Sequence, residues 1–171
     1  MKTFKCSLDP NSIRQVVTEL QQYEATLREK TVEFRKRVAE YLAEDAKGGF
    51  MAAIVDDLLR GGAKHASVDV TPDEKGNMSV VIAQGEDAVW AEFGTGVYHN
   101  GAVGSSPHPK GAELGFRIGT YGKGHGARNV WVYADDDGKH FTHGAPASMP
   151  MYNAMKHVCD NLVDIAKEVF G

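Results

Sequence analysis

Residues 88–99 read Ala-Val-Trp-Ala-Glu-Phe-Gly-Thr-Gly-Val-Tyr-His, and this stretch separates a regularly patterned part of the chain from a glycine-rich part. A short apolar element carries one carboxylate, Glu92, and stops at Gly94-Thr95-Gly96. Two glycines around a threonine allow positive φ twice, so the backbone can turn sharply here. The apolar element is too short for periodicity to distinguish a third strand from a single helical turn that ends at Gly94.

Helical patterning fills the sequence before this stretch, over residues 9–60. Asp9 and Pro10 are typical of an N-cap and a first helical residue. The pattern predicts either one long helix to about Ala46 or two helices with a break near Lys30-Thr31, ended by Gly48-Gly49. A short apolar helix over residues 50–59 follows, and Gly61-Gly62 closes it. The apolar residues with helical spacing are Ile13, Val16, Val17, Leu20, Tyr23, Leu27, Phe34, Val38, Tyr41 and Leu42.

Alternating patterns over residues 66–145 predict antiparallel strands. Val68 and Val70, a polar turn over residues 72–77, and alternation over residues 78–83 predict a first hairpin. Residues 129–133 and 139–142 flank Asp135-Asp136-Asp137-Gly138, whose Asp-Gly pair is typical of a hairpin turn. Between the two hairpins, residues 94–128 form a long loop rich in glycine. Loops of this length inside a compact domain are usually functional or disordered.

The last element is an amphipathic helix over residues 148–170. Ser148 is placed to cap it and Pro150 lies in its first turn. The sequence therefore predicts a single α+β domain over residues 1–171, with long N-terminal helices, a small antiparallel sheet and a C-terminal helix packed on the sheet. The predicted apolar seam of that helix consists of Met151, Met155, Val158, Leu162, Ile165 and Val169.

Composition limits the classes of function. The chain of 171 residues is 42% hydrophobic and 25% charged, with a formal net charge of -4, which argues against non-specific nucleic-acid binding over the whole surface. No secretory signal or membrane-spanning run is found, so we expect a cytoplasmic protein without membrane contact. Cys6 and Cys159 are interpreted as free thiols in a reducing compartment, although a disulfide between them stays open.

Catalytic and metal-binding motifs are weak. No Gly-x-Ser-x-Gly elbow is found, and neither cysteine has a plausible catalytic partner. His99, His108 and His125 lie in the long loop without regular spacing, and Glu92 lies close to His99 in sequence. We therefore expect no enzyme, no metal and no cofactor. The alternative in a different class is a small metal-dependent hydrolase that uses Glu92 and the loop histidines.

Two stretches resemble the head–tail joining proteins (tail-completion or minor tail proteins) of long-tailed, non-contractile bacteriophages. The first is small-x-x-Glu-Phe-Gly-Thr-Gly, which begins here at Ala88 or Ala91. The second is His-Gly-Ala-Pro-Ala-Ser-Met-Pro-Met, residues 143–151, which leads into the C-terminal helix. The resemblance covers about residue 34 to the end. The residues that it marks as structural or interacting are Glu92, Phe93, Gly94, Thr95, Gly96, Gly144, Pro146 and Pro150.

This resemblance implies a structural protein of the virion, assembled in the host cytoplasm and located at the head–tail junction. Such a protein forms a ring with copies of itself around the DNA channel and contacts neck, connector and tail-tube proteins, while DNA passes without specific binding. A tail terminator or neck adaptor of the same virion is the alternative within this class. Head-to-tail contacts in a ring join two different faces of the subunit. The candidate faces are the turn and loop that begin at Glu92 and the exposed face of the first helix.

Overall fold

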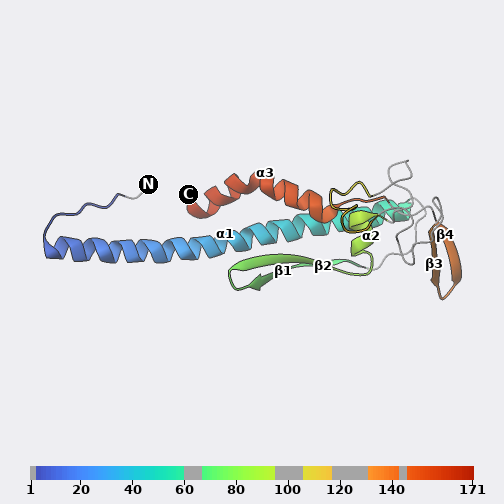
Figure 1. Cartoon of the computed structure of the whole chain (residues 1–171), viewed down its shortest axis with the longest axis horizontal. Helices are drawn as coiled ribbons and strands as arrows, with labels where there is room; N and C mark the ends of the chain where they lie inside the picture. The colour runs from blue at the N-terminus through green and yellow to red at the C-terminus, as the bar shows by residue number, and fades with distance from the viewer. Residues whose placement is uncertain (1–2, 60–66, 95–105, 117–130, 143–145) are drawn as a thin grey trace.

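The computed structural model of the chain describes residues 3–59, 67–94, 106–116, 131–142 and 146–171. Helix α1 runs the length of the molecule, with α3 along one side and the β1–β2 hairpin along another (Figure 1). The α+β fold class is therefore confirmed. The elements in chain order are α1 Pro10–Leu59, β1 Asp69–Lys75, β2 Met78–Gln84, α2 Ala88–Phe93, β3 Trp131–Asp135, β4 Gly138–Thr142 and α3 Pro150–Phe170.

Helix α1 begins where the sequence predicts. The Asp9 carboxylate oxygen Oδ1 accepts the backbone N–H groups of Asn11 at 2.9 Å and of Ser12 at 3.1 Å. The Ser7 hydroxyl donates to the second carboxylate oxygen, and this bond, followed by the bond from the Ser12 backbone, lowers the pKa of Asp9. These bonds satisfy two of the amides that an α-helix leaves open at its start. The prediction of Asp9 as cap and Pro10 as first residue is confirmed.

The predicted end of this helix at Gly48-Gly49 is wrong. Helix α1 is continuous over 50 residues, about 75 Å at the usual rise, without a break at Lys30-Thr31 or at the glycines. A β carbon at Gly49 would lie 2.9 Å from the Pro150 Cβ, whereas one at Gly48 would meet nothing within 4 Å. Gly49 therefore allows α3 to approach α1 closely and does not end the helix. Gly61-Gly62 lie outside the described residues.

The first hairpin is longer than predicted. Its register pairs Thr71 with Ile82 and Lys75 with Met78, so β1 continues through most of the predicted turn and the connection is Gly76-Asn77, with Gly76 at φ 59°. Pro72 lies within β1. A two-stranded sheet consists of edge strands alone, where a proline need not interrupt a hydrogen-bond ladder. The predicted turn over residues 72–77 is thus corrected to two residues.

One charged cluster ties this hairpin to α1. Arg35 donates from Nη2 to a Glu74 carboxylate oxygen at 2.8 Å and from Nε to the Ser79 hydroxyl at 3.0 Å. The Ser79 hydroxyl also donates to Glu74. That bond and, after it, the Arg35 guanidinium lower the pKa of Glu74. The cluster fixes the position of the hairpin along the helix.

The second hairpin confirms its predicted turn. Asp135 pairs with Gly138, which leaves Asp136-Asp137 as a two-residue connection, and Gly138 adopts φ 125°. The described strands form two separate two-stranded antiparallel sheets, β1–β2 and β3–β4. The predicted start of the first strand of this hairpin, residues 129–130, lies outside the described residues.

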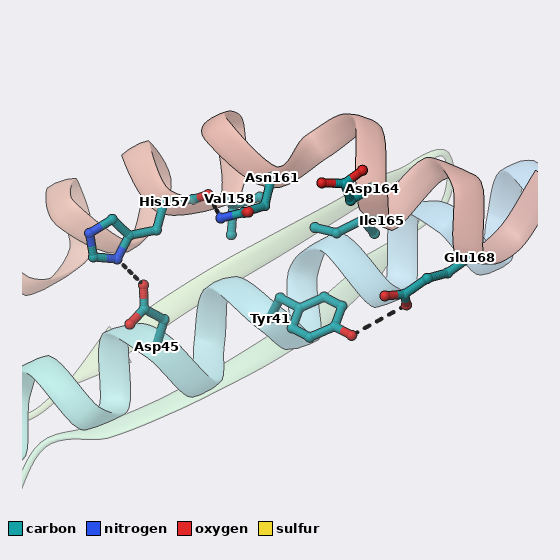
Figure 2. A pocket seen from close by; sticks show the side chains of 8 residues that line it. All are labelled: Tyr41, Asp45, His157, Val158, Asn161, Asp164, Ile165 and Glu168. Atoms are coloured by element: carbon teal, nitrogen blue, oxygen red, sulfur yellow. Dashed lines mark hydrogen bonds and ion pairs between the residues drawn. The ribbon is translucent and has the colours of Figure 1, made fainter.

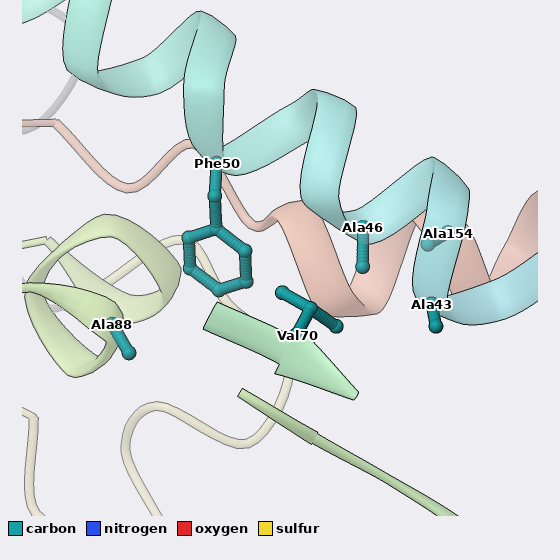
Figure 3. Close-up of a cluster of buried hydrophobic side chains, with 6 residues drawn as sticks. All are labelled: Ala43, Ala46, Phe50, Val70, Ala88 and Ala154. Atoms are coloured by element: carbon teal, nitrogen blue, oxygen red, sulfur yellow. The ribbon is translucent and has the colours of Figure 1, made fainter. Parts of the chain in front are cut away.

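The buried core lies where α1, α2, α3 and β1 meet (Figure 3). Phe50 is 1% exposed and is the largest fully buried side chain of the described residues. Helix α3 packs along α1 and adds Ala154 to the cluster that contains Val70 of β1. The members of the cluster are Ala43, Ala46, Phe50, Val70, Ala88 and Ala154.

The predicted seam of α3 is only partly buried. Val158, Ile165 and Val169 are buried as expected, but Met155 is 47% exposed and Leu162 is 40% exposed. The small residue Ala154 takes the innermost place at 1% exposure. Because α3 approaches α1 closely at Gly49, an alanine fits the interface better than a methionine does.

The two glycines of α1 provide a matched test of this close approach. Gly48→Ala should raise the free energy of unfolding by about 0.5–1 kcal/mol, because alanine is the better helix former and the space is open. Gly49→Ala should be less stable than Gly48→Ala by about 1–3 kcal/mol, since the methyl group must displace Pro150. Urea unfolding of both variants measures the difference. Equal stabilities would contradict the assigned role of Gly49.

Candidate functional site

Glu92 lies at the centre of the candidate site, on the six-residue helix α2, and is 6% exposed. Its Oε2 accepts the Met151 backbone N–H at 2.8 Å, and its Oε1 accepts that of Tyr152 at 3.0 Å. These amides belong to the first turn of α3, where the helix dipole favours negative charge. Glu92 therefore caps a helix that lies about 60 residues further along the chain.

The backbone before α3 completes this cap. Met149, the residue before the helix, adopts a left-handed conformation with φ 54° and ψ 46° and makes no side-chain capping bond. The Ser148 and Met149 amides donate to the Ala91 carbonyl at 2.9 and 3.3 Å. The Asn153 amide donates to the Met149 carbonyl at 2.9 Å. The predicted N-cap at Ser148 is wrong, because the acceptor for the first amides of α3 comes from α2.

His108 contacts the same carboxylate. Its Nε2 lies 3.3 Å from Glu92 Oε1, and both side chains are 9% exposed. Its Nδ1 accepts the Lys110 backbone N–H at 3.1 Å. The carboxylate therefore accepts two backbone amides from α3, and the His108 ring lies beside it.

Aromatic side chains pack residues 106–116 onto this centre. The rings of Phe93 and Phe116 stack with centroids 4.1 Å apart, and the His108 ring lies 4.5 Å from Phe93 and 5.3 Å from Tyr152. Phe116 also accepts the Ser106 amide at 3.1 Å through its carbonyl. The segment is thus a closed loop against α2 and the start of α3. We call residues 88–94, 106–116 and 146–152 the Glu92 junction.

The junction brings together some of the predicted site residues. Glu92, Phe93 and Gly94 lie beside the start of α3 at Pro150, and Pro146 is half-buried just before it. Of the three loop histidines, His108 contacts Glu92. Sequence reasoning missed Ser106 and Phe116, which no periodic pattern marks. The predicted residues that lie outside the described ones are Thr95, Gly96, His99, His125 and Gly144.

The chemistry of the junction is that of a structural cap. Each oxygen of Glu92 accepts one backbone amide of α3, and the His108 ring lies 3.3 Å from Oε1. Among the described residues, no group of three or more His, Cys, Asp or Glu side chains is arranged to hold a metal ion. Cys6 and Cys159 are free thiols on the surface. None of the described helices combines the length and the apolar character needed to cross a membrane.

Apart from the Glu92 junction, a hollow of about 320 Å³ lies between α1 and α3 (Figure 2). On one side His157 Nδ1 lies 2.8 Å from Asp45 Oδ2. At its other end Glu168 accepts bonds from Arg37 at 2.8 Å and from the Tyr41 hydroxyl at 3.4 Å. These exposed pairs join the two helices, and solvent weakens each of them. We interpret the hollow as a by-product of this contact.

Removal of the carboxylate tests the cap. Glu92→Leu should lower the free energy of unfolding by about 2–4 kcal/mol, since two half-buried amides at the start of α3 lose their acceptor. Glu92→Gln keeps one acceptor oxygen and should lose about half as much. Glu113→Gln, an exposed site on the same loop, is the control. The free energies of unfolding are measured by thermal and urea unfolding. Equal values for Glu92→Leu and Glu113→Gln would show that Glu92 does not stabilise the start of α3.

Gly94 tests the turn. It adopts φ 72° and ψ 174°, a conformation essentially confined to glycine, while its amide donates to the Trp90 carbonyl at 2.7 Å. Gly94→Ala should lower the free energy of unfolding by about 1–3 kcal/mol. The helical substitution Gly48→Ala is the control for loss of a glycine, and both are measured in urea. An unchanged midpoint for Gly94→Ala would mean that the turn accepts a side chain.

The chain was compared with protein families, curated proteins and solved structures. No protein family, curated protein or solved structure matches the chain. The function therefore has to be inferred from the residues of the Glu92 junction and from the surfaces of the described elements.

Proposed function

We propose that the chain is a structural protein of a bacteriophage virion. In this role it completes the tail or joins it to the capsid connector, as a ring around the DNA channel at the head–tail junction. The observation that carries the proposal is the contact between the two stretches that resemble head–tail joining proteins. Glu92 of the first stretch accepts the backbone amides of Met151, the last residue of the second stretch, and of Tyr152, which follows it. The two motifs are thus parts of one structural unit.

The contacts of Glu92 favour a scaffold over a hydrolase. A catalytic carboxylate needs an oxygen within reach of a substrate or of a bound water. Here the carboxylate is 6% exposed, and each of its oxygens accepts a backbone amide at the start of α3. Stiffening a turn against a helix start is useful in a protein whose role is to hold its neighbours in place.

The charge of the chain suits a DNA channel. A formal net charge of -4 supplies no general attraction for phosphate, so DNA can slide past without being held. The partners in this proposal are further copies of the chain, a neck or connector protein on the capsid side and the tail-tube protein on the other. Catalysis, cofactors and membranes have no part in it.

Loss of the protein from its virus tests this role directly. A phage with a stop codon in the gene should produce full heads and complete tails that remain separate, and electron microscopy of the lysate shows this. Purified protein added to that lysate should restore joined, infectious particles, which plaque counts measure. Heat-unfolded protein is the control. Normal titres without the protein, or tails that fail to form at all, would overturn the proposed role.

A further inference from the structure

The N-terminal half of α1 carries an apolar row, exposed except for the half-buried Val16, which we call the α1 stripe: Ile13, Val16, Leu20, Tyr23 and Leu27. The spacing alternates between three and four residues, which places the side chains on one face of the helix. Ile13, Leu20 and Leu27 are 43–46% exposed. Tyr23 meets the edge of the Phe4 ring at 6.0 Å and is still 43% exposed. A row of this length on a protein surface marks an interaction site.

The α1 stripe continues the face of α1 that already binds a helix. Further along the same face, the Phe34 ring lies 5.8 Å from that of Phe170, and Tyr41 contacts Glu168 of α3. Figure 1 shows that α1 projects beyond the end of α3 and beyond the β1–β2 hairpin. The stripe is therefore the uncovered extension of a helix-packing surface, and it suits another amphipathic helix.

Helix α3 has an exposed apolar row of its own, beside the row that packs on α1. We call it the α3 strip: Met155, Cys159, Leu162 and Val163. Val163 is 67% exposed and Met155 is 47% exposed. The strip spans about 12 Å and the α1 stripe about 21 Å at the usual helical rise. Both rows are apolar, and the strip can cover the central part of the stripe.

We infer that the α1 stripe of one copy packs against the α3 strip of a second copy. The inference rests on the proposed function, because it names the contact that links subunits in the ring. The two rows lie on different elements, so the contact is heterologous and passes from each copy to the next. One kind of contact then covers both rows. A symmetric pairing of two α1 stripes would leave the α3 strip exposed.

The charged residues beside each row favour the same pairing. Glu19 borders the α1 stripe and Lys156 borders the α3 strip, whereas Glu24 and Lys167 pair with Arg28 and Asp164 within their own helices. Two α1 stripes in parallel would bring their Glu19 carboxylates together, whereas the α3 strip supplies Lys156 to face Glu19.

Cross-linking between copies tests the contact, and Cys159 provides one thiol within the α3 strip. In the full chain, Cys6→Ser removes the other thiol and Leu20→Cys places a new one at the centre of the α1 stripe. A short bis-maleimide should then produce a ladder of dimers, trimers and larger species on a denaturing gel. Cys6→Ser alone, and Cys6→Ser with Leu20→Cys and Cys159→Ser, should give monomers.

Each result decides the matter. Dimers from the variant that lacks Cys159 would show symmetric α1–α1 pairing and overturn the inference, as would monomers in every variant. Joined phage particles without the ladder would reject this contact and keep the proposed function. The ladder from a protein that fails to join heads to tails would keep the contact and reject that function.

Charge substitutions supply a second readout without a cross-linker. Leu20→Glu and Leu162→Glu should each reduce the mass found by light scattering at high concentration to that of one chain, 18.6 kDa. Met78→Glu, at a 62% exposed site on the hairpin, should leave the assembly intact. All three substitutions are at exposed positions, and circular dichroism checks that the fold is retained. Assembly that survives both charge substitutions in the rows contradicts the proposed contact.

Discussion

The structure depends on the placement of one buried carboxylate at the start of α3. A buried charge is costly unless it is hydrogen-bonded, and Glu92 accepts the Met151 and Tyr152 amides beside the His108 ring. The hydrogen bonds satisfy both partners, because the amides at the start of α3 would otherwise lack acceptors. Once α3 begins here, Pro150 lies against Gly49 and the helix runs back along α1. The relative positions of α1, α2 and α3 therefore follow from this contact.

Local patterns in the sequence predict the elements well where the deciding interaction is itself local. Asp9 caps α1 through amides two and three residues away, and Gly138 follows a two-residue turn. The predictions fail where the partner is distant. The pair Gly48-Gly49 suggests a helix end. Instead, Gly49 leaves room for Pro150, which lies about 100 residues later in the chain. Ser148 suggests a cap, yet Glu92 supplies it. The sequence does not show whether a glycine ends a helix or makes room for a distant residue, or whether a serine caps the helix that follows it.

The candidate site was predictable in part for the same reason. Glu92, Phe93 and Gly94 could be singled out because a lone carboxylate before a glycine turn is conspicuous. His108 appeared only as one of several loop histidines, and Phe116, which stacks on Phe93, had no signal. The phase of the α3 seam was also beyond the sequence. A methionine and an alanine one residue apart fit the same helical row, and the closeness of α1 decides that Ala154 is buried.

The interior that these contacts define is made largely of small side chains. Around Phe50 the cluster consists of four alanines and one valine, while larger apolar residues lie on the surfaces of α1 and α3. Small residues let helices approach closely and fix their relative rotation. The direction of the α3 strip therefore depends on how α3 is seated at the Glu92 junction. On the proposed contact between copies, the motif residues influence assembly from inside the subunit, since they orient a surface that they do not form.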